Sequence, residues 1–123
     1  MDRFKDRIAL VTGAGRVGSI GFAIARKLHE EAASVILVDR DAEALAEAAG
    51  ELGPGVTCFE ADVSQRSQLA AVFKSVAEKF GRLDILMNNA GITQSGRTVD
   101  ITDEDYDRLM NINLRGSLTA SQL

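Results

Sequence analysis

Hydrophobic and polar positions follow two different periods along the chain, and the two periods alternate. Short continuous apolar runs, typical of strands buried on both faces, occupy residues 8–11, 35–38, 56–61 and 83–87. After each run, apolar residues return every three or four positions, which is the spacing of one face of a helix. The clearest such stripe consists of Leu69, Val72, Phe73, Val76 and Phe80. The pattern predicts four strands and four helices in alternation.

Local sequence signals mark the ends of the predicted helices. The second helix covers residues 42–52, where Gly53-Pro54-Gly55 ends it, and Gly81 closes the third. Thr102-Asp103-Glu104-Asp105 has the form of a capping box and opens the fourth helix. That helix is still continuing at residue 123, the last of the sequence.

The order of these elements predicts the fold class. Continuously apolar strands separated by helices imply parallel pairing, with right-handed crossovers that bury both faces of the sheet. The 123 residues are 46% apolar, which suits one domain with a modest core, and they show no repeat, low-complexity tract or linker. We therefore expect a single domain of the α/β class.

Charge, hydropathy and cysteine content narrow the classes of function. The net charge is −4 and no basic run could follow the phosphates of a nucleic acid, so no nucleic-acid partner is expected. No apolar run approaches the roughly 20 residues of a membrane span, and the charged start is no secretion signal, so we expect no membrane partner and a cytoplasmic location. One cysteine and one histidine predict no metal site. We interpret Cys58 as core filler and His29 as a solvated surface residue.

A glycine-rich loop between the first strand and the first helix is the first candidate for chemistry. In this geometry backbone N–H groups and the positive end of a helix can receive a pyrophosphate, and glycines allow the close approach. Residues 13–18 match the G-x-G-x-x-G pattern of dinucleotide-binding loops. A glycine-rich structural turn matches the same pattern, so the loop alone leaves both interpretations open.

Asp39 is a second candidate, because it ends the second strand about 20 residues after the loop. A carboxylate there can accept hydrogen bonds from the ribose hydroxyls of adenosine and repels a 2′-phosphate, which favours NAD over NADP. Arg16 and Arg40 favour the opposite preference, since either guanidinium could pair with a 2′-phosphate. Asp39-Arg40-Asp41 can also be interpreted as only a helix N-cap with solvated neighbours.

Several short motifs together resemble the short-chain dehydrogenase/reductase family. They are Thr12-Gly13 with the Ser-Ile-Gly that follows, Asp39, Asp62-Val63, Asn88-Asn89-Ala90-Gly91 and Asn113-Leu114-Arg115-Gly116, collinear from about residue 7 to residue 116. The resemblance implies a Rossmann-type parallel sheet in a three-layer α/β/α arrangement, with strand order 3-2-1-4. It also implies that residues 1–123 are the N-terminal part of a single NAD(P)-binding domain, ending within a helix.

The resemblance implies a role for individual residues. Four would line the cofactor phosphates: Gly13, Ser19, Ile20 and Gly21. Asp39 would bind the adenosine ribose, and Asp62 and Val63 would flank the adenine. Beside the cofactor, at the end of the fourth strand, would run Asn89, Ala90 and Gly91. Asn88 would bridge strands rather than touch the cofactor.

The glycine loop departs from the usual family pattern, Thr-Gly-x-x-x-Gly-x-Gly. Five residues separate Gly13 from Ser19, two more than the pattern has, and a serine stands where the middle glycine belongs. This spacing is similar to the enoyl-acyl-carrier-protein reductase branch, whereas Asn-Asn-Ala-Gly is similar to the main branch. In this alignment Gly15 and Gly18 belong to a lengthened turn.

Asn113 is the candidate for a catalytic role. It lies seven residues after Tyr106, close to the line of the apolar stripe formed by Tyr106, Leu109 and Met110, so its amide is expected on an inward face. A buried amide needs hydrogen-bond partners. A core asparagine bonded to backbone fits this position. The resemblance implies instead the asparagine that holds a water or a backbone group in a proton relay.

The remaining chemistry of the family is not found in these residues. Family members transfer a hydride between nicotinamide and a carbonyl or hydroxyl compound, with a tyrosine as general acid or base, a lysine four residues later and a serine. Tyr106 is the only tyrosine, and Met110 stands four residues after it. The expectation is a parent oxidoreductase that acts on a small alcohol or ketone, with 3-oxoacyl compounds among the candidates, and a 123-residue chain that is inactive alone.

The alternative to an oxidoreductase is a non-catalytic nucleotide-binding or interaction module on the same half-fold. Family members commonly form dimers or tetramers through the helix that begins here at Asp103, so the resemblance implies a homo-oligomer.

Overall fold

The structure, a computed structural model, describes residues 2–123 and contains a parallel sheet of four strands. The strands are β1 (Ile8–Thr12), β2 (Ser34–Asp39), β3 (Val56–Glu60) and β4 (Ile85–Met87), and they lie in the order β3-β2-β1-β4. Neighbouring strands are parallel throughout. The predicted order 3-2-1-4 is confirmed, and each strand end lies within two residues of its predicted place.

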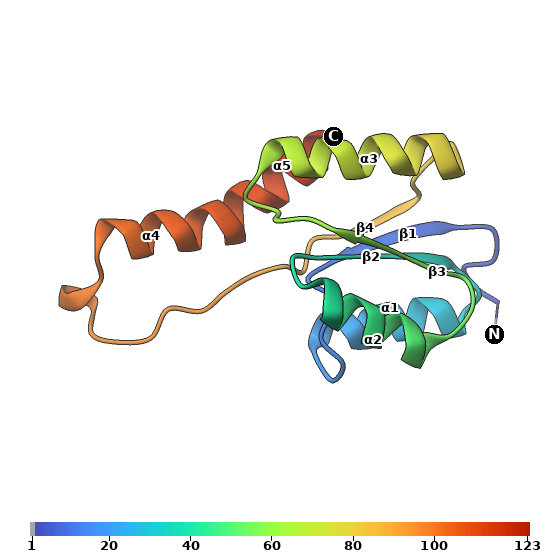
Figure 1. Cartoon of the computed structure of the whole chain (residues 1–123), viewed down its shortest axis with the longest axis horizontal. Helices are drawn as coiled ribbons and strands as arrows, with labels where there is room; N and C mark the ends of the chain where they lie inside the picture. Colours follow the sequence, from blue (N-terminus) through green and yellow to red (C-terminus); the bar gives the residue numbers. More distant parts are fainter. Residues whose placement is uncertain (1) are drawn as a thin grey trace.

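Helices cover both faces of the sheet (Figure 1). α1 (Ile20–Glu30) and α2 (Ala42–Leu52) lie on one face, and α3 (Arg66–Phe80) and α5 (Gly116–Gln122) lie on the other. This arrangement confirms the predicted three-layer α/β/α architecture.

The last predicted helix is divided in the structure. After β4 the chain passes through a short 3-10 turn, η1 (Thr98–Asp100), into α4 (Asp103–Met110), which projects beyond the sheet. A π turn, η2 (Asn111–Arg115), then joins α4 to α5. The capping box is confirmed: the Thr102 side chain accepts the N–H of Asp105, and the Asp105 side chain accepts the N–H of Thr102.

The central strands carry apolar side chains on both faces, as the continuous apolar runs predict. Towards α1 and α2, the fully buried side chains include Ala9, Val11, Val35 and Leu37. Towards α3, the fully buried side chains are Leu10, Ile36 and Val38, which pack with Val72 and Val76. A slip of one residue would move each side chain to the other face, away from the helix against which it packs.

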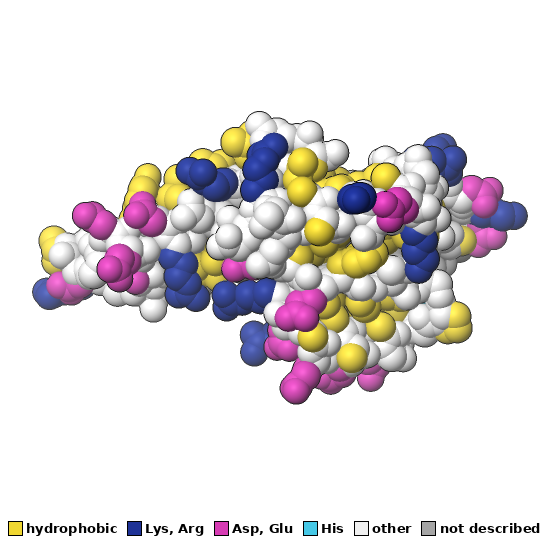
Figure 2. Space-filling model, turned by 45° about the horizontal axis from the view of Figure 1, so that its top comes forward, with side chains coloured by type: hydrophobic (Ala, Val, Ile, Leu, Met, Phe, Trp, Pro, Cys, Tyr) yellow, Lys and Arg dark blue, Asp and Glu magenta, His cyan; other side chains and the backbone are white. Residues whose placement is uncertain are grey.

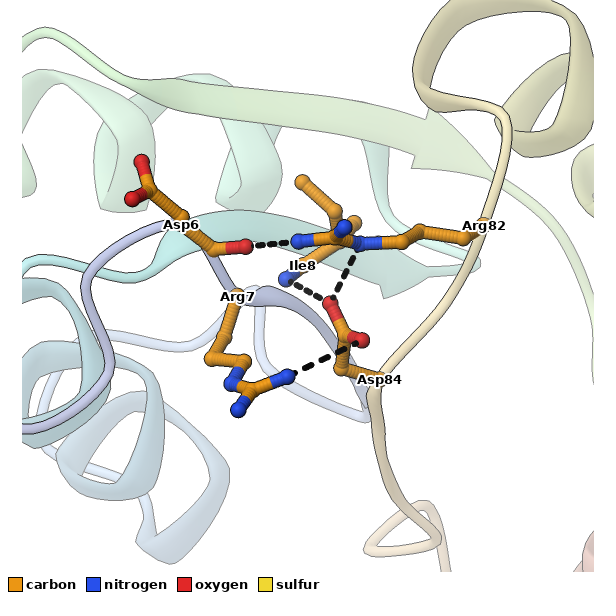
Figure 3. A network of polar contacts seen from close by, with 5 residues as sticks. All are labelled: Asp6, Arg7, Ile8, Arg82 and Asp84. Carbon is orange, nitrogen blue, oxygen red and sulfur yellow. Dashed lines mark hydrogen bonds and ion pairs between the residues drawn. The ribbon is translucent and has the colours of Figure 1, made fainter.

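A carboxylate fixes β4 beside the amino end of β1 (Figure 3). Asp84 Oδ2 accepts the N–H of Ile8 at 2.8 Å, and the N–H of Asp84 donates to the Ile8 carbonyl at 2.9 Å. The Arg82 guanidinium lies 3.1 Å from the same carboxylate and also donates to the carbonyl of Asp6, while Arg7 lies 3.8 Å from Asp84 Oδ1. The hydrogen bond from Ile8, with help from Arg82 and Arg7, lowers the pKa of Asp84. The short strand β4 is thereby held in register at its first residues.

A second carboxylate ties the chain's first residues to the end of α1. The Glu31 carboxylate receives a two-point hydrogen bond from Arg3, with both distances 3.0 Å, and an ion pair from Lys27 at 2.9 Å. The N–H of Phe4 donates to the Glu31 carbonyl at 2.9 Å. Glu31 is only 4% exposed, and its hydrogen bonds from Arg3 and then Lys27 lower its pKa to about 2.

Cys58 and His29 are both half-buried. Cys58 is half-buried beside the core, its Sγ lies 3.6 Å from the Leu45 carbonyl, and burial raises the pKa of its thiol, so its interpretation as core filler fits. His29 differs from its predicted solvated state, because its Nε2 lies 2.6 Å from the carbonyl of Pro54 and it is half-buried. His29 therefore joins the end of α1 to the turn before β3.

Exposed apolar side chains gather in the last quarter of the chain. Of the eight exposed large hydrophobic residues within residues 2–123, six lie there: Val99, Ile101, Tyr106, Leu114, Leu118 and Leu123. Figure 2 shows the arm that α4 forms at the left, with acidic and hydrophobic side chains side by side on its surface. Within residues 2–123, no helix has the length and apolar character needed to cross a membrane.

We predict that Glu31→Gln lowers the Tm at neutral pH, because the neutral amide no longer neutralises Arg3 and Lys27. The folded-state pKa of about 2 lies below the ordinary value of 4.5, so the stabilisation is complete above the ordinary value and is lost as the pH falls towards 2. The Tm difference between the two proteins, followed by circular dichroism, should therefore be largest at neutral pH and shrink in acid.

Glu30→Gln is the matched control for this comparison. Glu30 is an exposed neighbour whose contact with Arg26 is 3.8 Å long, so its replacement should change the Tm little at any pH. A Tm difference for Glu31→Gln that stays constant from neutral pH to about pH 3 would contradict the assignment.

Candidate functional site

A cleft of about 360 Å³ opens at the carboxyl edge of the sheet, beside the N-terminus of α1. Its lining contains all ten residues that are expected from the sequence to contact a cofactor: Gly13, Ser19, Ile20, Gly21, Asp39, Asp62, Val63, Asn89, Ala90 and Gly91. The rest of the lining is Arg16, Arg40, Ala61, Ile92 and Ile112. Loops far apart in the sequence meet here because the carboxyl ends of parallel strands share one edge of the sheet.

The buried hydroxyl of Thr12 joins the carboxyl ends of β1 and β4. Thr12 Oγ1 accepts the N–H of Asn89 at 3.1 Å and the N–H of Ala90 at 3.0 Å, and it donates to the Met87 carbonyl at 3.4 Å. These three bonds use the whole capacity of a hydroxyl, which has one donor and two acceptor sites. The sequence pattern by itself predicts no role for this side chain. A polar residue that ends an apolar strand was the signal that could have found it.

The two neighbouring asparagines differ in part from the roles expected of them, although Asn89 lines the cleft as predicted. The Asn89 side chain is the bridge between strands, since its Nδ2 donates to the carbonyls of Thr12 and Gly13 at 3.1 and 3.2 Å. The Asn88 side chain instead donates to Ser121 Oγ on α5 at 3.1 Å. The expectation that Asn88 bridges strands is therefore wrong, because its side chain faces the opposite helical layer.

Two glycines allow the loops to approach closely. A Cβ on Gly13 would lie 2.7 Å from Cα of Ala90, and Gly13 has a φ of +67°, which disfavours any other residue. A Cβ on Gly21 would lie 2.5 Å from both Asn89 Nδ2 and the Gly13 carbonyl. The first glycine of the loop, the start of α1 and the end of β4 are therefore packed backbone to backbone.

The amino end of α1 faces the cleft with its own cap in place. Ser19 is the N-cap, and its Oγ accepts the N–H of Phe22 at 3.2 Å. No acidic residue lies in the first turn, so nothing there offsets the positive end of the helix dipole. Gly18, one residue earlier, has a φ of +88°, and a Cβ there would meet no atom within 4 Å, so this glycine serves the turn alone.

Asp39 projects its carboxylate between two loops. Its Oδ2 accepts the N–H of Gly15 and its Oδ1 accepts the N–H of Asp41, each at 3.1 Å. The N-cap of α2 is Asp41, whose side chain accepts the N–H of Ala44 at 3.1 Å. The capping interpretation thus applies to Asp41, and the carboxylate of Asp39 belongs to the cleft.

Two arginines stand beside Asp39 in the cleft. Arg16 and Arg40 both line it, and both are exposed. Within the described part of the chain, neither guanidinium lies within ion-pair distance of a carboxylate. The lining of the cleft therefore contains two basic side chains beside the Asp39 carboxylate, and Asp62 is the second acidic residue in it.

The loop after β3 supplies another wall of the cleft. The Asp62 carboxylate bends back on its own loop, with Oδ1 accepting the N–H and the hydroxyl of Ser64 at 2.9 and 2.6 Å. Val63 is buried against Leu69 and Ala120. A Cβ on Gly116 would lie 2.9 Å from Val63 Cγ2, so α5 packs closely against this wall.

Asn113 lies in the π turn and holds the segment that follows β4. Its Oδ1 accepts the N–H of Ile92 and its Nδ2 donates to the Ile92 carbonyl, both at 2.8 Å. The expected inward position is wrong, because Tyr106 on α4 is 57% exposed and Asn113 in the π turn is exposed as well. Asn113 does not line the cleft. Its hydrogen-bond partner Ile92 does, so Asn113 acts on the cleft only by holding Ile92.

The sheet order and the cleft at its carboxyl edge define a Rossmann-type α/β domain. The family model for short chain dehydrogenases matches residues 7–123, and the chain belongs to this family.

Two curated relatives illustrate the match. An uncharacterized oxidoreductase from Staphylococcus epidermidis is 36% identical over 122 residues, which cover 99% of this chain and 52% of the relative. Galactitol 2-dehydrogenase from Agrobacterium fabrum is 39% identical over 116 residues, or 94% of this chain and 44% of the relative. The chain thus spans about half the length of the curated relatives it matches.

Solved structures show the same fold. A 3-ketoacyl-(acyl-carrier-protein) reductase from Brucella melitensis, crystallised with NADH, superposes with a TM-score of 0.91 at 32% identity, covering 97% of this chain and 48% of that one. A short chain dehydrogenase from Mycobacterium smegmatis gives a TM-score of 0.92 at 32% identity, covering 99% of this chain and 52% of that one.

We predict that Gly13→Ala destabilises the protein more than Gly18→Ala does. Both glycines have positive φ, so both alanines incur strain of about 1 to 2 kcal/mol. Only at Gly13 does the new Cβ also meet backbone, at Cα of Ala90, which should add about 1 to 3 kcal/mol. Urea unfolding followed by circular dichroism measures both losses. Equal losses would show that the contact between Gly13 and Ala90 relaxes freely.

Proposed function

We propose that the cleft binds a nicotinamide dinucleotide, NAD(H) in preference to NADP(H), as part of an oxidoreductase of the short-chain dehydrogenase family. The reaction would transfer a hydride between nicotinamide and the carbonyl or hydroxyl group of a small molecule. One observation carries the proposal: the positive end of α1, the backbone of Gly13 and Gly21, and the Asp39 carboxylate converge on the lining of one cleft.

The glycine cradle fits the pyrophosphate of such a cofactor. Gly13 and Gly21 line the cleft, and their lack of a side chain lets the loop and the start of α1 pack closely against the end of β4, which brings the loop backbone to the cleft. The N-terminus of α1 provides N–H groups and a positive dipole end, and both favour an anion. We assign Gly13, Ser19, Ile20 and Gly21 to the phosphates.

The Asp39 carboxylate fits an unphosphorylated ribose. Each of its oxygens receives one backbone N–H and retains acceptor capacity for a ribose hydroxyl. Its negative charge disfavours a 2′-phosphate, and this argument supports NAD(H). Arg16 and Arg40 support the second candidate, NADP(H), because both line the cleft. We assign the adenine to the wall at Asp62 and Val63.

The residues after β4 would hold the nicotinamide end. When bound, nicotinamide supplies or accepts the hydride. We assign Asn89, Ala90 and Gly91 to the side of the cofactor. We also propose that Asn113, by holding both polar groups of Ile92, fixes this segment and takes part in the family's proton relay.

The substrate class follows from the relatives and stays broad. The names of two of them give galactitol and a 3-ketoacyl compound as substrates of those proteins. For this chain we propose a small alcohol or ketone, 3-oxoacyl compounds included. A cytoplasmic location and a homo-oligomer formed through the helix at Asp103 stay predictions of the sequence.

A non-catalytic nucleotide-binding module is the second candidate function. It is favoured by the absence of a Tyr-x-x-x-Lys pair from the 123 residues, in which Tyr106 is followed four positions later by Met110. The coding DNA after codon 123 distinguishes the two. An in-frame continuation with a serine and Tyr-x-x-x-Lys supports the oxidoreductase, and a genuine stop codon supports the module.

We predict that Asp39→Ala weakens the binding of NADH by about tenfold, because a hydrogen bond to a charged group contributes roughly 1.5 to 3 kcal/mol. The affinity for NADPH should change by less than about threefold, since removal of the negative charge offsets the lost bonds. Isothermal titration calorimetry measures both constants. Glu47→Ala is the control, because it removes the same charge from an exposed position on α2, and it should alter neither binding constant. Equal losses for NADH and NADPH would refute the assignment of Asp39.

We predict that the 123-residue chain binds NADH weakly and oxidises or reduces no alcohol or ketone by itself. The reason is that it holds no tyrosine and lysine pair to move the proton that accompanies the hydride. NADH absorbance, followed with galactitol and with 3-oxoacyl compounds, provides the measurement. Hydride transfer above the rate without protein would contradict the prediction.

A further inference from the structure

Gly15 lies in the loop after β1, and membership of a lengthened turn does not explain the contacts that it makes. It is buried, and its N–H donates to Asp39 Oδ2 at 3.1 Å. The other oxygen of the same carboxylate accepts the N–H of Asp41 at 3.1 Å. Backbone amides from two different loops therefore hold the carboxylate from both sides.

The backbone of Asp39 is fixed independently of its side chain. The Asp39 carbonyl accepts the N–H of Ala61 at 2.9 Å, and the carbonyl of Val38 accepts the N–H groups of Gly13 and Ala14 at 2.8 and 3.4 Å. With the strand end held in this way, the part of Asp39 that can still turn is the carboxylate. Gly15 is one of the two groups that stop it from turning.

The lack of a side chain at Gly15 is as important as its N–H. A Cβ there would lie 3.0 Å from Asp39 Cβ, 3.0 Å from Cγ and 3.1 Å from Oδ2. Carbon atoms in favourable contact lie about 3.5 to 4.0 Å apart, so the Asp39 side chain would have to move. Gly15 does not have the positive φ of Gly13 or Gly18. The conflict is therefore with the Asp39 side chain and not with the backbone conformation.

We propose that Gly15 is a positioning residue that sets the preference for an unphosphorylated ribose, acting through Asp39. This inference rests on the proposed binding of NAD(H). Two backbone amides use one acceptor site on each carboxylate oxygen, so each oxygen can accept one hydroxyl of a vicinal diol. A side chain at residue 15 would turn the carboxylate away from that arrangement and away from the place where it repels a 2′-phosphate.

The test compares wild type, Gly15→Ala, Asp39→Ala and the double variant, each titrated with NADH and with NADPH by calorimetry. Gly15→Ala should weaken NADH binding by about tenfold and NADPH binding by less than about threefold. In the Asp39→Ala background, Gly15→Ala should weaken NADH binding by less than about threefold, because no carboxylate remains to be turned. This non-additivity is a readout that a merely structural glycine would not produce.

Gly50→Ala is the matched control. Gly50 is exposed on α2, and a Cβ there would meet no atom within 4 Å. Its replacement should leave both affinities unchanged. The Tm of every variant is measured alongside, so that a loss of folding is not taken for a loss of binding.

A second measurement keeps the inference testable if Gly15→Ala does not fold. In the nitrogen-proton NMR spectrum, Asp39→Asn should move the amide protons of Gly15 and Asp41 upfield, because asparagine offers one neutral acceptor oxygen, weaker than a carboxylate, and its NH2 group accepts no hydrogen bond. The amide of Gly50 should stay in place. An unmoved Gly15 amide would overturn the inference.

The outcomes separate this inference from the proposed function. If Asp39→Ala changes the ratio of NADH to NADPH affinity and Gly15→Ala does not, the role of Gly15 is overturned while the proposed cofactor stands. If Asp39→Ala leaves the ratio unchanged, the ribose assignment fails, and the role of Gly15 fails with it. A reduced ratio in both single variants, with no further reduction in the double variant, supports the role.

Discussion

The hydroxyl of Thr12 fixes the distance between the carboxyl ends of β1 and β4, and the cleft depends on that junction. One hydroxyl joins the backbone of Met87, Asn89 and Ala90, and the Asn89 amide returns two hydrogen bonds to Thr12 and Gly13. A buried polar group with all its partners is specific in geometry, because any shift leaves a donor or acceptor unpaired. The close approach of Gly13 to Ala90 is possible only while this junction holds.

The opposite end of the same strand pair is fixed by a different means. At the amino end, Asp84 accepts the N–H of Ile8 and contacts Arg82 and Arg7 (Figure 3). A charged group therefore joins β1 to β4 at this end, as the Thr12 hydroxyl does at the carboxyl end. β4 has only three residues, too few for its ladder alone to set its position strongly. The two anchors together keep this short strand in register, and the register places the residues after it beside the start of α1.

The sequence predicts the sheet and the members of the cleft better than it predicts their contacts. Runs such as residues 35–38 are apolar on both faces, which identifies a central parallel strand, and collinear motifs identify the residues that meet at its end. That Asn89 rather than Asn88 bridges the strands was not predictable, because side chains after the end of a strand no longer follow its alternation. The π turn at residues 111–115 lacks any glycine or proline before Gly116 and is accompanied by the pairing of Asn113 with Ile92. The contact of Gly15 with Asp39 was not predictable either, because the two residues are distant in the sequence.

The central claim is that the carboxyl edge of the sheet, and no other part of the chain, receives the dinucleotide. The most direct measurement is a titration of the isotopically labelled chain with NADH, followed in the nitrogen-proton NMR spectrum. We predict that the amides of residues 13–21, Asp39 and residues 89–91 shift progressively, while those of Ile8 and Asp84 at the amino edge stay in place. Shifts concentrated at the amino edge or on α4, or no shift at millimolar NADH, would contradict it.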